Sequence, residues 1–110
     1  MDVPTARSRL QDMLAELDRS LGVLRGEYPE RESSAADAGT VLTDGDRVQA
    51  ALASLGRQRR AVAAALDRVE AGTYGRCVGC GEPVPEGRLE VRPDAARCVP
   101  CQSRHDRAHR

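Results

Sequence analysis

Apolar residues recur along the first part of the chain with the alternating four- and three-residue spacing of a heptad repeat. The repeat positions are Leu10, Leu14, Leu17, Leu21, Leu24 and Tyr28. Pro4 suits the first turn of a helix, whereas Pro29 cannot continue one. The pattern therefore predicts a helix from Pro4 to Tyr28 with one narrow apolar stripe.

A second stripe with the same spacing occupies the middle of the chain. It consists of Val48, Leu52, Leu55, Arg59, Val62, Leu66 and Val69, with Val41 one heptad upstream. Gly72 is a residue type expected just beyond a helix end, so the spacing predicts a helix over residues 41–71. Two narrow stripes of similar length joined by a short connection predict an antiparallel coiled-coil hairpin.

One charged residue, Arg59, interrupts the second stripe. If Val48 lies beside Tyr28 in the antiparallel pair, Arg59 falls near Leu17, which has an acidic residue on each side. We expect the guanidinium to extend past the apolar stripe and to help fix the register of the two helices. Its expected partner is one of these two carboxylates, Glu16 or Asp18.

The connection between the stripes, near residues 29–43, contains turn and capping residues and forms the predicted tip of the hairpin. From residue 27 to residue 46 the chain carries six acidic residues and one basic residue, Arg31. Composition alone favours a solvated polar loop here. An acidic binding surface is the alternative.

All the cysteines of the chain fall into two Cys-x-x-Cys pairs, Cys77 with Cys80 and Cys98 with Cys101. The 17 residues between the pairs give the spacing of a four-thiolate zinc site. Four cysteines fill the coordination shell and leave no position for water, so the pattern indicates one structural Zn²⁺ rather than a catalytic one. The expected ligands are these four residues.

The residues around the cysteines suit such a site. We expect glycines at positions 79 and 81 to supply the positive φ that such tight cysteine turns often need and to leave backbone N–H groups facing the thiolates. The formal charge of −2 on a zinc with four thiolates is expected to be offset in part by nearby arginines, namely Arg76, Arg97 and Arg104.

Disulfides and a redox Cys-x-x-Cys are the alternative interpretations of the cysteines. Disulfides suit an oxidising compartment, and no hydrophobic signal segment opens this sequence. A thioredoxin-like motif requires a surrounding βαβ pattern, which the sequence lacks. His105 and His109 are spaced for metal binding, but they lack a third ligand nearby and are interpreted as solvated side chains.

Length and composition limit the fold and the partners. The 110 residues include neither Trp nor Phe, and 31% of them are charged, which favours long exposed helices over a large core. We expect a mainly α fold, with the hairpin over residues 1–72 and a four-cysteine zinc-finger module ending in a short helix over residues 73–110. The net charge of zero gives no reason to expect binding to bulk nucleic acid or to membranes, and we expect a cytoplasmic location.

The finger and its flanking residues resemble a known family. The segments that carry the likeness are Gly72-Thr-Tyr-Gly-Arg-Cys77-Val-Gly-Cys80-Gly, Arg88-Leu-Glu, and Pro93-Asp-Ala-Ala-Arg-Cys98-Val-Pro-Cys101-Gln. Over residues 72–102 they are similar to the DksA/TraR zinc-finger family, and the predicted hairpin agrees with that family's architecture.

The resemblance implies a bacterial transcription regulator that binds RNA polymerase directly and does not recognise DNA sequence. In this family the hairpin enters the secondary channel of the polymerase, acidic tip residues approach the catalytic magnesium, and the finger region anchors the base outside. The resemblance turns the acidic connection into a candidate functional site. Its candidate residues are Asp37, Asp44 and Asp46.

The sequence departs from the family at two places. The tip signature Asp-x-x-Asp-x-Ala falls on residues 34–39 in an ungapped count back from Cys77, and only Asp37 matches. Family members also respond to the alarmone ppGpp through basic residues. Since none of the corresponding positions here is cationic, we expect a weak ppGpp response or none. These positions are Ser54, Ala61 and Gln102.

Two other classes of function remain. A zinc-finger adaptor that docks another protein or a nucleic acid is the main alternative. A nucleic-acid finger normally carries a basic stripe with stacking aromatics, yet residues 76–110 hold seven Arg, five acidic residues and no Phe, Trp or Tyr. An enzyme is least supported, because zinc would sequester every cysteine.

Overall fold

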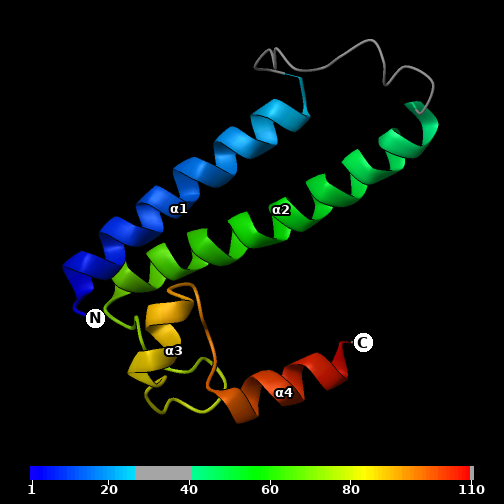
Figure 1. Cartoon of the computed structure of the whole chain (residues 1–110). Helices are drawn as coiled ribbons and strands as arrows, with labels where there is room; N and C mark the ends of the chain where they lie inside the picture. Colours follow the sequence, from blue (N-terminus) through cyan, green and yellow to red (C-terminus); the bar gives the residue numbers. More distant parts are fainter. Residues whose placement is uncertain (27–40, 110) are drawn as a thin grey trace.

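The computed structural model describes residues 1–26 and 41–109, with side chains from residue 45 onward in the second segment. These ranges contain four helices: α1 (Val3–Leu24), α2 (Val41–Ala71), α3 (Glu86–Val91) and α4 (Val99–Ala108). Figure 1 shows α1 and α2 antiparallel, with the segment that carries α3 and α4 beside the end where α1 begins and α2 ends. The predicted fold class, a helical hairpin followed by a small finger and a C-terminal helix, is confirmed.

Helix α1 begins where the sequence predicts. The Asp2 carboxylate accepts a hydrogen bond from the backbone N–H of Thr5 at 2.9 Å and caps the helix, and Pro4 lies in the first turn. This capping lowers the pKa of Asp2, chiefly through the hydrogen bonds from Thr5. The start of α1 is therefore well defined by local chemistry.

Helix α1 ends earlier than the apolar repeat predicts. Its last residue is Leu24, and Gly26 follows with a left-handed φ of 81°. The Gly26 N–H bonds to the carbonyl of Val23 at 3.0 Å, which satisfies a carbonyl of the last turn. The prediction that the helix continues to Tyr28 is wrong, because this glycine ends it before Pro29 is reached. Tyr28 itself lies outside the described residues.

Helix α2 has the predicted bounds. Gly72 follows it with φ of 78°, and its N–H bonds to the carbonyl of Val69 at 3.2 Å. The N–H of Thr73 bonds to the carbonyl of Arg68 at 2.9 Å. These two bonds with a left-handed glycine form a Schellman motif, which ends α2 and turns the chain toward the finger.

The main apolar cluster between α1 and α2 lies in the half nearest the finger, and Leu21 is buried separately near the far end of α1. The buried members of this cluster are Leu10, Val62, Ala65 and Val69, and partly buried neighbours complete it: Met13, Leu14, Leu17, Leu66 and Tyr74. Most of these residues come from the predicted stripes. Tyr74 follows α2 and lies outside both stripes. Ala65 and Met13 lie on the helices but outside the stripes, so the packed face is wider here than a strict heptad stripe. Farther along α2, Val48, Leu52 and Leu55 are only half-buried.

Two ion pairs define the register of the hairpin. Arg59 Nε on α2 lies 2.5 Å from Asp18 Oδ1 on α1, so Asp18 is the partner among the two expected carboxylates. Arg7 Nε lies 3.7 Å from Glu70 Oε1. Both pairs fit one register, since Arg7 and Asp18 are as far apart along α1 as Arg59 and Glu70 are along α2. The predicted register is confirmed.

Helix α3, a six-residue helix between the two cysteine pairs, was not predicted from the sequence. It follows Pro85, which has an extended conformation with φ of −56° and ψ of 140°. The described residues contain no β-strand, only an isolated antiparallel bridge between Arg76 and Pro83. No helix in the described ranges combines the length and apolar character that crossing a membrane requires.

Candidate metal centre

The sulfur atoms of Cys77, Cys80, Cys98 and Cys101 gather at one point, all within 4.8 Å of one another. The sulfurs of Cys80 and Cys98 are 3.8 Å apart. A tetrahedral zinc with Zn–S of about 2.3 Å has sulfur–sulfur edges of about 3.8 Å. A disulfide would need about 2.05 Å, and all four cysteines are free. The donor set and its spacing therefore fit one zinc ion.

The first cysteine pair lies on a tight turn held by backbone hydrogen bonds. The Cys77 N–H bonds to the Glu82 carbonyl at 2.8 Å, and the Gly81 N–H bonds to the Cys77 carbonyl at 2.9 Å. Gly81 has the expected positive φ, 80°. The Gly79 N–H points at the Cys77 sulfur from 3.3 Å, as predicted for a thiolate-facing amide.

Gly79 does not have the positive φ that we expected, so that prediction is wrong. A side chain there would instead crowd the second cysteine pair. A Cβ at this position would lie 3.1 Å from the Cys101 sulfur and 3.2 Å from the Cys101 Cβ. The two cysteine turns approach too closely for a side chain to fit between them without a shift.

The second cysteine pair is built into the start of α4. Cys98 is the N-cap residue and Cys101 lies in the first turn, so the helix itself directs both sulfurs to one side. The Gln102 N–H bonds to the Cys98 carbonyl at 2.8 Å. A bond of 2.8 Å from the Val78 N–H to the Ala96 carbonyl joins the two turns. The positive end of the α4 dipole lies at this site and suits thiolates.

One of the three expected arginines contacts a cysteine sulfur in the described structure. Arg104 Nη2 lies 3.1 Å from the Cys101 sulfur. Arg76 instead donates to the Gly81 carbonyl at 3.2 Å. The Arg97 carbonyl accepts a hydrogen bond from Arg88 Nε at 2.9 Å. The latter two bonds stabilise the fold of the finger around the cysteines.

The thiols differ in acidity. Burial opposes ionisation of Cys77, but backbone hydrogen bonds from Cys98, Cys80 and Gly79 outweigh it and lower the pKa of the Cys77 thiol to about 6. Hydrogen bonds with the Cys98 and Cys77 side chains, together with burial, raise the pKa of Cys101 to about 12. Because zinc binds thiolates, the backbone donors around Cys77 favour the form that coordinates metal.

The cysteines are also part of the apolar core of the finger. Cys77 and Cys101 are buried together with Val84, Leu89 and Ala95, and Leu89 is supplied by α3. Tyr74 and Met1 pack against this cluster, and Tyr74 also packs against the core between α1 and α2. The bridging role of these two residues was not predicted, because neither Met1 nor Tyr74 belongs to a periodic apolar pattern.

The remaining candidate residues are placed as follows. Asp46 is exposed on α2, Asp44 lies in α2 with its side chain outside the described residues, and Asp37 lies wholly outside them. His105 and His109 stack with ring centroids 4.1 Å apart. No third potential ligand gathers with them in the described ranges, where the four cysteines are the only such group.

Two of the three positions expected at the alarmone site lie together. Ala61 and Gln102 both line a cavity of about 380 Å³ between α2 and the finger, whereas Ser54 is not among its lining residues. Charged residues that were not predicted for this site share the cavity: Arg88, Arg92, Arg97, Asp94 and Asp106. One of the two acids lies near an arginine, since Asp94 is 3.8 Å from Arg92.

Comparison with known proteins gives the same picture of the finger. Residues 72–107 match the family model described as the prokaryotic dksA/traR C4-type zinc finger. The chain is 40% identical over 84 residues to the RNA polymerase-binding transcription factor DksA of Caulobacter vibrioides, covering 76% of this chain and 54% of that protein. This chain thus spans about half the length of that curated relative.

A solved structure extends the likeness to the helices. Transcription factor DksA2 from Pseudomonas aeruginosa superimposes with a TM-score of 0.74 at 26% identity, over 97% of this chain and 84% of that one. A further relative is tRNA dimethylallyltransferase 1 of Mycobacterium ulcerans, 34% identical over 96 residues, which cover 84% of this chain but 29% of that protein.

The four gathered cysteines and the matched finger define a C4-type zinc finger with one structural zinc. The finger, residues 72–107, belongs to the DksA/TraR zinc-finger family. The helix pair that precedes it is arranged as in the DksA2 structure.

Proposed function

We propose that this protein is a transcription regulator that binds RNA polymerase and is not an enzyme. The observation that carries the proposal is the combination of a long antiparallel helix pair with a zinc finger of this family at one end. The relatives named DksA support it, because one of them is described as RNA polymerase-binding. The partial similarity to a transferase covers 29% of that enzyme and supports no catalytic role.

In this proposal the helix pair enters the secondary channel of the polymerase. Helix α2 has 31 residues, which corresponds to a rod about 46 Å long at about 1.5 Å per residue. The register-fixing ion pairs Arg59–Asp18 and Arg7–Glu70 support a stiff rod. A rod of this length can carry its far end well beyond the surface on which the finger rests.

The acidic connection between the helices is the proposed acting part. Six acidic residues lie between residues 27 and 46 with one basic residue, so this end of the hairpin carries net negative charge. Negative charge favours approach to a basic channel that contains magnesium. We assign the tip role to Asp37, Asp44 and Asp46, with Asp37 first because it matches the family signature.

The zinc is proposed to be held by Cys77, Cys80, Cys98 and Cys101 and to serve structure only. The ion would join the start of α4 to the first cysteine turn and complete a small core. Structural zinc sites contribute on the order of 10 kcal/mol of folding free energy, more than a finger of this size gains from apolar burial. We propose that this finger, over residues 73–110, anchors the base of the hairpin over residues 1–72.

We further propose a weak ppGpp response or none at the family's alarmone site. The two expected positions in the cavity are Ala61 and Gln102, which provide no cation. Two of the three arginines beside them have partners of their own, since Arg88 donates to the Arg97 carbonyl and Arg92 faces Asp94. Tight ppGpp binding that depends on this cavity would contradict this part of the proposal.

The experiment that tests the function is a pull-down of purified bacterial RNA polymerase, followed by transcription in vitro. Wild type and the Asp37→Ala variant are both expected to bind, and only Asp37→Ala is expected to lose the effect on transcription. Asp12→Ala on α1 is the matched control, because it removes an exposed carboxylate away from the tip. Failure of the wild type to bind polymerase would favour an adaptor that docks another partner.

A further inference from the structure

Side chains carry the contact between the zinc module and the helix pair. In the described ranges neither α3 nor α4 packs its backbone against α1 or α2. A groove of about 400 Å³ lies between the two parts, lined by Met13, Leu17, Gln58 and Val62 of the helix pair and by residues 91–94 of the finger. The orientation of the module therefore depends on side chains that reach from one part to the other.

Tyr74 is the first bridge. Its ring packs against both apolar cores, and its hydroxyl donates a hydrogen bond of 2.8 Å to the Pro93 carbonyl. It lies two residues after Gly72, beside the covalent connection between α2 and the finger. Attachment at this place alone would leave the finger free to swing about the connection, as about a hinge.

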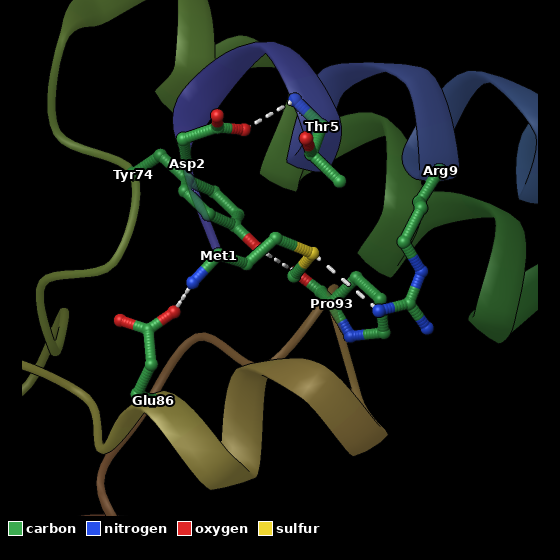
Figure 2. A network of polar contacts seen from close by, with 7 residues as sticks. All are labelled: Met1, Asp2, Thr5, Arg9, Tyr74, Glu86 and Pro93. Atoms are coloured by element: carbon green, nitrogen blue, oxygen red, sulfur yellow. Dashed lines mark hydrogen bonds and ion pairs between the residues drawn. The ribbon is translucent and has the colours of Figure 1, made fainter.

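Met1 is the second bridge, and it connects the finger to the start of α1. Its side chain is 4% exposed and packs against the finger cluster that contains Cys77 and Cys101. Its ammonium group pairs with the carboxylate of Glu86 on α3, and Figure 2 shows this pair below the start of α1. Arg9 Nη1 lies 3.4 Å from the Met1 sulfur.

The residue after Met1 joins it firmly to α1. Asp2 caps the helix through its carboxylate, and its carbonyl accepts the Ala6 N–H at 2.9 Å. Met1 therefore has little freedom relative to α1, while its side chain and amine are held by the finger. The two bridges connect the finger to different helices, one to the end of α2 and one to the start of α1.

We propose that Met1 is a positioning residue that holds the zinc module in one orientation relative to the helix pair. Burial of its side chain in the finger core supplies most of the attraction, because an ion pair with an exposed carboxylate contributes little by itself. The contact of the Met1 nitrogen with Glu86 adds an orientation-dependent interaction between α1 and α3. This inference concerns the junction alone and holds whether or not the hairpin enters a polymerase.

The test is the relative orientation of the two parts in the full zinc-loaded chain, measured by NMR residual dipolar couplings. One alignment tensor is expected to fit α1, α2 and the finger in the wild type. A chain that lacks Met1 is expected to lose this common tensor and to need a separate, weaker one for the finger. Unchanged amide shifts around the four cysteines and unchanged zinc content would show that the finger remains folded.

Further variants separate the side chain from the contact with Glu86. Met1→Leu keeps an apolar side chain of similar size and is expected to retain the common tensor, whereas Met1→Ser is expected to lose it. Glu86→Gln neutralises the carboxylate that faces the Met1 nitrogen. It is expected to weaken the alignment of the finger relative to Glu90→Gln, the matched control on α3. If one alignment tensor of wild-type magnitude still fitted the helices and the finger in the chain without Met1 and in Met1→Ser, the proposal would be overturned.

Discussion

The backbone of Gly79 lies so close to Cys101 that a Cβ at position 79 would stand 3.1 Å from the Cys101 sulfur. This approach brings the two cysteine turns together and leaves the Gly79 N–H pointing at the Cys77 sulfur. The glycine thus serves the zinc site through its missing side chain.

Gly79→Ala is therefore expected to weaken zinc binding. The methyl group would push the two cysteine turns apart. Changes to the residues that support metal ligands typically reduce metal affinity on the order of tenfold. Competition with a chromogenic chelator measures this loss. Gly87→Ala is the matched control, because a Cβ there meets nothing within 4 Å, and its affinity should equal that of the wild type. Equal affinities for all three proteins would contradict the steric account.

Removal of zinc is expected to unfold the finger and to leave most of the helical signal. Chelation withdraws the ion that joins the first cysteine turn to α4, and a structural zinc contributes on the order of 10 kcal/mol. α1 and α2 contain most of the helical residues, so the helical circular dichroism signal should decrease only in part. In NMR spectra the amide signals of residues 77–101 should lose their dispersion. A finger spectrum that survives chelation would contradict a structural role for the metal.

Asp18→Asn is expected to destabilise the hairpin at neutral pH, since it removes the partner of Arg59. The hydrogen bond from Arg59 lowers the pKa of the Asp18 carboxyl below 3.8. A carboxyl with a lowered pKa adds stability above its ordinary pKa and loses it as the pH falls through the lowered value. The difference in thermal midpoint between wild type and Asp18→Asn should therefore shrink with acid, and also with salt.

Glu16→Gln is the control for this register, because Glu16 is the other carboxylate that the repeat places near Arg59. Exchange of the charges, with Arg at position 18 and Asp at position 59, should recover part of the stability that either single reversal loses. An equal effect of Glu16→Gln and Asp18→Asn would mean that Arg59 does not select one partner.

Tyr74→Phe is expected to cost about 1 kcal/mol of unfolding free energy, the usual value for one hydrogen bond. The change removes the hydroxyl that donates to the Pro93 carbonyl and keeps the ring that packs against both cores. Denaturant unfolding monitored by signals of the finger measures this change in unfolding free energy. Tyr74→Ala should cost clearly more, since it also removes the ring; equal costs would mean that the packing of the ring matters little.

Periodic spacing of residues along the chain made much of this molecule predictable. Residues three and four apart share a helix face, so the repeats specified α2 and the antiparallel pairing, and the charged Arg59 within the stripe pointed to its partner on α1. Paired Cys-x-x-Cys turns likewise have few structural solutions. These features were predicted because one pattern constrains many residues.

Features that depend on one residue or on tertiary contacts were missed or mistaken. The left-handed Gly26 ended α1 inside a repeat that continued to Tyr28. Helix α3 is a single short element whose Gly87 disfavours a helix, and packing of Leu89 against the cysteines compensates. The steric need at Gly79 and the burial of Met1 arise only when distant segments meet.

The most direct test of the proposed function is site-specific photo-crosslinking from position 37 of the otherwise unchanged chain, bound to purified RNA polymerase. We expect a crosslink to the polymerase close to its catalytic magnesium, and loss of that crosslink when the wild-type protein competes. The same crosslinker at position 12, on α1 away from the tip, should not reach that place. A crosslink from position 37 only to the outer surface of the polymerase, or to no part of it, would contradict the account.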